Sequence, residues 1–229
     1  MTTTRLVQAV STACVLSLTP ILTTTTSAAV SEKLKNRIDE SATVLTEIHA
    51  APDKDIPKEL WDRAACVIVV PNLKKAAFVF GGEYGKGLMS CRKGGAWSAP
   101  VFMRLEKGSW GLQIGAQSID LVLLVNNERG MKKLLGNKVT LGAEASVAAG
   151  PVGRDARAAT DAQMNAEILS YSRAQGLFAG INLSGGVLRP DTDDNEDAYG
   201  KDVVPATVLT GNTAAPAAMQ PFMKALIRK

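Results

Sequence analysis

Apolar residues follow a helical rhythm at the start of the folded region and an extended rhythm after it. Ser31 can cap a helix that ends near Ala50, and the apolar positions of this segment fall on one helical face. These positions are Leu34, Ile38, Leu45 and Ile48. A second, shorter helix is expected to begin near Pro57, because proline fits the first turn of a helix.

Short apolar runs begin at Cys66 and predict a series of strands. In chain order they read CVIVV, AAFVFGG, GKGLMSCR, AWSAPVFMRL, WGLQIGAQ and IDLVLLV. The first run should stop at Pro71, since proline lacks the backbone N–H that a sheet uses. Tight hairpin turns are expected at Gly94-Gly95 and at Lys107-Gly108. This arrangement favours an antiparallel meander.

The second half of the chain adds short helices and further strands. A helix is expected from Asn126 to Gly136, a strand from Leu141 to Arg154, and two strands broken near Gly176. The segment PAAMQPFMKALIRK predicts a final helix, and DTDDNEDAYGKD predicts a solvated acidic loop. Together the pattern predicts one α+β domain over residues 30–229. Its curved antiparallel sheet, which can close toward a barrel, carries an N-terminal helix, short connecting helices and a C-terminal helix.

Residues 1–29 have the composition of a secretory signal rather than of a fold. Arg5 precedes an apolar stretch from Leu6 to Leu22, and small residues Ser27 and Ala29 suit a cut after Ala29. We therefore expect an exported protein, periplasmic or secreted, that is soluble or bound peripherally to a membrane.

Charge and cysteine content narrow the classes of partner. Of 26 basic and 22 acidic residues, only Arg5 lies in the signal, so the net charge falls from +4 to +3. This mild charge does not favour nucleic acid, which selects a dense basic face. Cys66 and Cys91 lie in predicted strands; they form either a disulfide or two buried thiols.

The sequence indicates no catalytic centre, metal site or cofactor. His49 is the only histidine, and neither a G-x-S-x-G motif nor a phosphate-binding loop is present. Asp120 interrupts an apolar strand and is interpreted as a hydrogen-bonded acid at a strand end. Asp191, Asp193 and Asn195 have calcium-loop spacing, but Glu196 stands where that loop needs glycine.

The stretch LGAEASVAAGPVGR is unusually rich in small residues. Along a strand they would either allow close packing of another layer or leave a groove for an acyl chain. The turn that ends it can present backbone N–H groups to an anion, with Arg154 as a phosphate ligand or as a surface ion-pair partner.

Basic residues elsewhere are candidates for an anionic headgroup, or else belong to a solvated surface. They are Lys74, Lys75, Lys86, Arg92, Lys93, Lys132 and Lys133. The final helix is amphipathic, with Phe222 on its apolar side and Lys224 among its charges. It either lies in a membrane interface or docks on its own sheet.

Several separated motifs resemble one family. WSAP (Trp97–Pro100), GLQIGAQ (Gly111–Gln117), Asp120, LGAEASVAAGPVGR and YSRAQGLFAG (Tyr171–Gly180) occur in this order. Over about residues 31–209 the chain is similar to the SYLF-domain family of lipid-binding proteins. The resemblance implies a non-enzymatic domain; eukaryotic members bind phosphoinositides, and some are linked to actin.

The chain departs from that family in ways that bear on function. We expect no Src-homology-3 or FYVE domain within these residues, and the first helix carries three bases against four acids. Phospholipid or another anionic amphipathic lipid at the cell envelope is the expected ligand, and actin is not expected for an exported protein. The alternative is a structural or protein-interaction module of the envelope, and a hydrolase ranks third.

Overall fold

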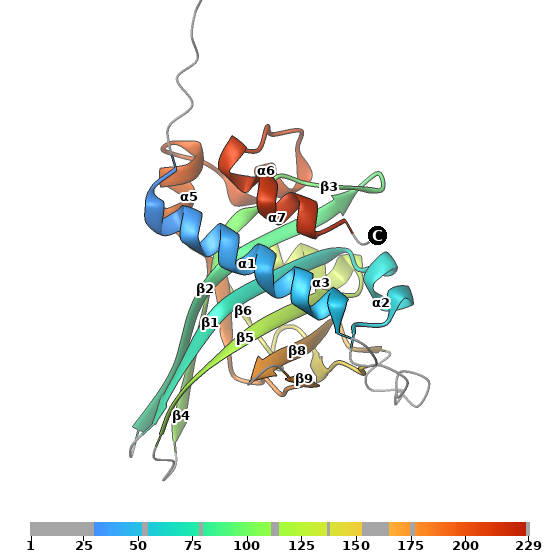
Figure 1. Cartoon of the computed structure of the whole chain (residues 1–229), viewed down its shortest axis with the longest axis vertical. Coiled ribbons are helices and arrows are strands. Elements are labelled where there is room, and N and C mark those ends of the chain that lie inside the picture. The colour runs from blue at the N-terminus through green and yellow to red at the C-terminus, as the bar shows by residue number, and fades with distance from the viewer. Residues whose placement is uncertain are drawn as a thin grey trace, which may run out of the picture.

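Helix α1 (Glu32–Ala50) crosses one face of a curled β-sheet, and helix α7 (Gln220–Ala225) lies beside it (Figure 1). This arrangement is seen in a computed structural model of the chain. The structure describes residues 30–51, 55–77, 80–110, 115–136, 138–152, 165–174 and 177–227. The predicted signal and Arg154 lie outside the described residues.

The described strands form one sheet, and most of the helices are short. The strands are β1 (Cys66–Ala77), β2 (Phe80–Lys93), β3 (Ala96–Trp97), β4 (Val101–Trp110), β5 (Gly115–Val125), β6 (Val139–Thr140), β7 (Val147–Ala149), β8 (Ile168–Ala174), β9 (Leu177–Gly180) and β10 (Val187–Pro190). The other helices are α2 (Lys58–Arg63), α3 (Glu128–Leu134), α5 (Thr192–Tyr199), α6 (Pro205–Thr210), the 3₁₀ helix η2 (Ala217–Met219) and α7 (Gln220–Ala225).

The sheet has the order β6-β10-β4-β2-β1-β5-β8-β7, with β3 on β2 and β9 on β8. Neighbours are antiparallel except β7 and β8, which run parallel. The predicted α+β class, curved sheet and terminal helices are confirmed.

Strand β1 does not stop at Pro71, contrary to the prediction. Its ladder with β5 shifts register between Val70 and Leu73, and Asn72 takes a positive φ of 52°. The Asn72 N–H donates to Asp120 Oδ1 at 3.0 Å. The strand therefore passes the proline as a bulge, where a missing ladder donor is tolerated.

One of the two predicted hairpin turns is present. Gly94 (φ 55°) and Gly95 (φ 88°) join β2 to β3, and this two-residue turn requires positive φ at both positions. Lys107 and Gly108 lie instead inside β4, where they pair with Glu83 and Gly82 of β2. The predicted turn there is wrong, because strand pairing continues past the glycine.

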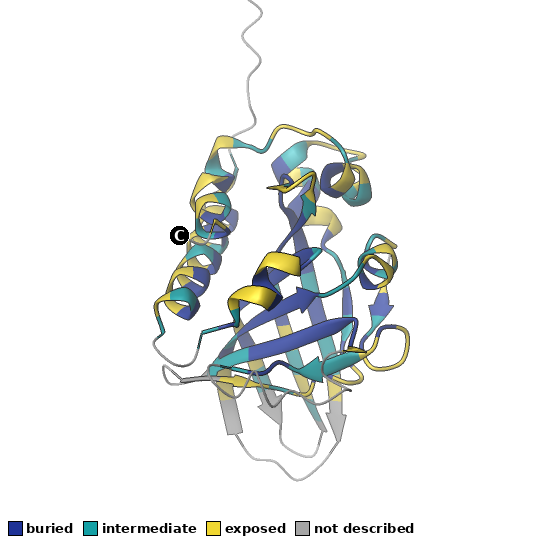
Figure 2. Cartoon of the chain, turned by 90° about the vertical axis from the view of Figure 1, so that its right-hand side faces the viewer, coloured by how far each residue is buried: buried dark blue, intermediate teal, exposed yellow. Residues whose placement is uncertain are grey.

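Both faces of the central strands are buried, which explains the uninterrupted apolar run CVIVV. Val67 and Val69 pack toward α1, α2 and α7, whereas Ile68 and Val70 point into the concave side with residues of α6. Buried residues follow the sheet in Figure 2, while the outward surfaces of the helices are exposed. None of the helices among the described residues combines the length and apolar character needed to span a membrane.

The small-residue stretch is mostly not a strand. Of its described part, only Val147–Ala149 forms β7, after a turn in which Gly142 has a φ of 84°. Gly150 packs closely against the Tyr171 ring: a Cβ added to this glycine would lie 2.1 Å from a ring atom. The glycine therefore serves close packing at this point.

Two cysteines fasten the ends of β1 and β2 where the strands meet α2 and β3. Cys66 and Cys91 face each other in the register and form a disulfide with an S–S distance of 2.07 Å. The bond fixes the base of the β2–β3 hairpin relative to the strand that follows α2.

Candidate functional site

The β2–β3 hairpin places a cation on an aromatic ring. Because Gly94-Gly95 makes a two-residue turn, Arg92 stands directly opposite Trp97 in the register. The guanidinium carbon of Arg92 lies 4.1 Å from the centroid of the Trp97 ring, a cation–π distance. The hairpin thus presents a positive charge on a flat apolar support.

Arg92 is held but not neutralised by this arrangement. Its Nη2 donates to the Trp61 backbone oxygen at 3.3 Å, while its Nε is buried without a hydrogen-bond partner. Burial lowers the pKa of Arg92, and the Asp62 carboxylate partly offsets that effect. A guanidinium stays charged despite such a shift, so the site keeps a cation with unused donor capacity.

Helix α2 supplies the back of the site. It follows Pro57, whose carbonyl accepts from Leu60 and Trp61 in the first turn. Trp61 is 1% exposed and lies 6.0 Å, centroid to centroid, from Trp97. The two indoles form an aromatic wall.

Helix α7 closes the site from the other side. Phe222 and Leu226 are fully buried in the cluster that includes α1 residues, which fixes the helix. Trp97 Nε1 donates to the Leu226 carbonyl at 3.2 Å and ties the end of α7 to the hairpin. Phe222 was a candidate lipid contact, but it is a core residue here, and the helix docks chiefly on α1.

These elements enclose a pocket of about 530 Å³. Figure 1 shows the end of the described chain between the β3 hairpin and α2. Its lining combines aromatic, aliphatic and cationic side chains: Trp61, Asp62, Arg92, Gly95, Ala96, Trp97, Gln220, Met223, Lys224, Leu226 and Ile227. Two of the sequence candidates, Arg92 and Lys224, meet here, and Lys93 follows Arg92 in the hairpin.

The described lining of the pocket combines cationic and apolar side chains. Among the described residues that line it, Asp62 is the one carboxylate, and it pairs with Lys58 on the exposed face of α2. The lining holds a cation beside apolar walls, which suits an anion attached to hydrocarbon.

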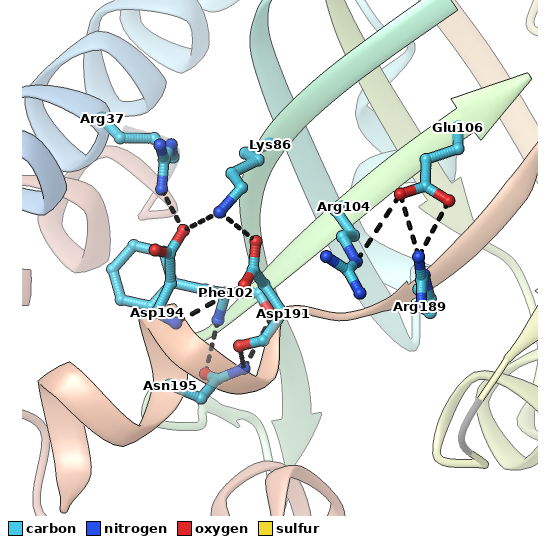
Figure 3. A network of polar contacts seen from close by, with 9 residues as sticks. All are labelled: Arg37, Lys86, Phe102, Arg104, Glu106, Arg189, Asp191, Asp194 and Asn195. Atoms are coloured by element: carbon cyan, nitrogen blue, oxygen red, sulfur yellow. Dashed lines mark hydrogen bonds and ion pairs between the residues drawn. The ribbon is translucent and has the colours of Figure 1, made fainter.

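Lys86, another candidate, belongs to a buried network instead (Figure 3). Its Nζ lies 2.5 Å from Asp191 Oδ2 and 3.0 Å from Asp194 Oδ2, and Arg37 Nη1 lies 2.5 Å from the same Asp194 oxygen. Burial alone would raise the pKa of Asp194, but Lys86 and Arg37 together hold it below its usual value.

This network shows why the predicted acidic loop is wrong. The segment forms helix α5, whose N-cap Asp191 accepts from the Asp194 N–H. Asn195 exchanges two 2.8 Å hydrogen bonds with the Phe102 backbone, so α5 is fastened to β4.

Nearby, Arg189 on β10 contacts both Glu106 oxygens at 3.0 Å (Figure 3).

The remaining basic candidates lie apart from the pocket. Lys133 Nζ contacts the buried Glu167 at 2.8 Å, and Lys132 pairs with Glu128 on α3. On β1, Lys75 pairs with Glu83, and Lys74 is exposed in the half of the strand beyond the bulge.

Asp120 is held by backbone and side-chain donors. Besides the Asn72 N–H, it accepts from Arg173 Nε at 2.9 Å and Arg173 Nη2 at 2.6 Å. Burial raises its pKa, the Asn72 N–H opposes this, and Glu40 adds to the rise. A polar hollow of about 380 Å³ lies here between α1 and the sheet.

Sequence reasoning missed most of the pocket wall. Trp61, Met223 and Leu226 were not among the sequence candidates, and nothing local in the sequence brings α2 to α7. The Arg92–Trp97 pair is different: the predicted Gly94-Gly95 turn already sets these two residues opposite each other.

Comparison with known proteins gives the family. Residues 106–229 match the Ysc84 family model, described as "Las17-binding protein actin regulator". An SH3 domain-containing protein of Schizosaccharomyces pombe is 38% identical over 167 residues, which is 71% of this chain and 39% of that protein.

Other relatives agree. LAS seventeen-binding protein 3 of Saccharomyces cerevisiae is 33% identical over 76% of this chain and 39% of its own length. SH3 domain-containing YSC84-like protein 1 of Homo sapiens is 31% identical over 80% of this chain and 56% of its own length. This chain thus spans about two fifths to just over half of these relatives. It belongs to the Ysc84 family, the SYLF-domain family that its sequence motifs indicate.

Proposed function

We propose that this chain binds an anionic amphipathic lipid, such as a phospholipid, without turning it over. The anionic group sits on Arg92, and hydrocarbon lies along Trp97, Met223 and Leu226. The observation that carries the proposal is the Arg92 guanidinium stacked at 4.1 Å on Trp97 in an otherwise largely apolar pocket.

The size of the pocket supports this class of ligand. A volume of about 530 Å³ falls within the roughly 300–1,000 Å³ that small-molecule sites occupy. It accommodates a headgroup with part of one chain, and the rest of a larger lipid would extend through the open mouth. Lys224 at the edge adds a second cation for a phosphate.

The proposed setting is the cell envelope. A signal in residues 1–29 would export the chain, and a disulfide between Cys66 and Cys91 fits an oxidising compartment. The intact mass of the protein purified from culture medium or envelope tests this: cleavage after Ala29 is expected, and an uncleaved cytoplasmic chain refutes it.

Displacement of a fluorescent single-chain anionic amphiphile tests the pocket. Arg92→Ala should weaken binding by roughly 10- to 100-fold, the value of a charge-assisted contact. Lys132→Ala, which changes an exposed cation on α3, is the matched control and should leave binding intact. Equal binding by wild type and Arg92→Ala would refute the assignment of the site.

The second candidate function is that of a protein-interaction module. The name of the yeast relative, LAS seventeen-binding protein 3, indicates such a function for that protein. An exported chain would not meet actin, so actin binding is not proposed here. Under this alternative the amphiphile would not bind, and Arg92→Ala would instead weaken capture of an envelope protein.

A further inference from the structure

One side of the pocket mouth carries an exposed aliphatic residue. Ile227 is 67% exposed, although its neighbour Leu226 is fully buried. Single exposed apolar residues are ordinary on protein surfaces. Ile227 differs in its place, because it lines the mouth of an apolar pocket next to Lys224.

The opposite side is the tip of the β2–β3 hairpin. Gly94, Gly95 and Ala96 are all exposed. A Cβ added to Gly94 or Gly95 would meet no atom within 4 Å, so the tip projects away from the rest of the protein. The mouth is thus bordered by two projecting features with little polar side-chain surface at their ends.

Exposed lysines lie next to the hairpin tip and to Ile227. Lys93 flanks the hairpin and is exposed, and among the described residues its Nζ contacts a neutral partner, Asn212 Oδ1, at 3.0 Å. Lys224 has no ion-pair partner among the described residues. The sequence continues after Ile227 with two more bases. Asp62, the one acid among the described residues of the pocket lining, is paired with Lys58.

We propose that this mouth docks on an anionic membrane surface, so that lipid enters the pocket directly from the bilayer. The inference rests on the proposed lipid-binding function. We define the docking surface as Lys93, Gly94, Gly95 and Ala96 together with Lys224 and Ile227. The apolar tips enter the interface, and the two lysines contact anionic headgroups.

Co-sedimentation of the full chain with vesicles tests the docking. Phosphatidylglycerol mixed with phosphatidylcholine should bind the chain, binding should fall with salt, and pure phosphatidylcholine should bind it weakly. Ile227→Asp should reduce the partition coefficient by about tenfold or more, as expected from one lost apolar insertion. Val204→Asp is the matched control, because Val204 is 56% exposed outside this surface and should tolerate the change.

A second pair of variants separates docking from pocket binding. Lys93 does not line the pocket, so Lys93→Glu should weaken vesicle binding several-fold while the affinity for a soluble anionic amphiphile stays unchanged. Lys132→Glu, on the opposite face of the sheet, should leave both unchanged. Every variant shares one N-terminus, so any contribution from residues 1–29 cancels.

The outcomes distinguish the two proposals. Equal vesicle binding by wild type, Ile227→Asp and Lys93→Glu would overturn the docking surface even if the pocket binds the amphiphile. Vesicle binding that depends on Ile227, with no amphiphile binding, would uphold docking on the membrane but overturn both the pocket function and lipid entry. Vesicle binding insensitive to salt and anionic lipid would also overturn the proposal.

Discussion

Lys86→Met is the sharpest test of whether the basic residues of this chain share one role. The substitution keeps most of the aliphatic stem but removes the charge that faces Asp191 and Asp194. The side chain of Asp191 is only 1% exposed and that of Asp194 only 10%. Arg37 still pairs with Asp194, so Asp191 is the carboxylate left buried without a cation.

The size of the effect follows from the charge of Asp191, which is left buried without a cation. Removing one partner of a buried ion pair costs about 3–5 kcal/mol of the free energy of unfolding. For a domain of this size, this corresponds to a fall in Tm of roughly 10 °C. Binding of the anionic amphiphile at temperatures below the transition should not change, because Lys86 is outside the pocket.

Urea unfolding followed by tryptophan fluorescence measures the loss. Lys86→Met combined with Asp191→Asn is the decisive companion, since asparagine can still cap α5 but carries no charge. The double variant should recover a substantial part of the stability. If Lys86→Met costs less than about 1 kcal/mol, or if it abolishes lipid binding in folded protein, the structural role assigned to Lys86 is wrong.

Three further changes probe the fold. Gly150→Ala should lower the free energy of unfolding by about 1–3 kcal/mol, because the new methyl group meets the Tyr171 ring; unchanged thermal denaturation would contradict this packing. Replacing Cys66 and Cys91 with serine should cost about 2–4 kcal/mol, given the 25-residue separation, and reductant should then have no effect on the variant's urea midpoint. The pKa of Asp194 lies below its usual value, so its stabilisation is complete above about pH 4 and is lost as pH falls further. Acid denaturation of Asp194→Asn should therefore be flatter below about pH 4, and an identical profile would refute the contribution.

Local patterns predicted the elements whose structure depends on near neighbours. Helix α1 follows its apolar spacing, and the β2–β3 turn follows from Gly94-Gly95. The continuation of β1 past Pro71 could not be read locally, because the Asn72 N–H finds its acceptor on Asp120, 48 residues away.

Helix α5 was missed although a signal was present. Asp191 is an N-cap residue followed by acids in the first helical turn, a typical helix start. The high charge of this segment favoured a solvated loop instead. What decides the outcome is distant: Lys86 and Arg37 neutralise the acids, and the Phe102 backbone binds Asn195.

The basic candidate residues also divide into those that the structure places at the pocket and those that it places in ion pairs elsewhere. Sequence identified Arg92 and Lys224 as possible anion ligands but gave equal standing to Lys86 and Lys133, which bind buried acids. Whether a lysine faces solvent or a carboxylate depends on tertiary contacts that no spacing rule encodes.

The docking of α7 on α1 also has a consequence for the order of assembly during synthesis. One wall of the pocket comes from α2 and the β2–β3 hairpin, early in the chain, and the other comes from residues 220–227. A nascent chain can pair β1 with β2, yet it cannot form the pocket until residues 220–227 have been made. Lipid binding would then be absent from every nascent form that ends before residue 220.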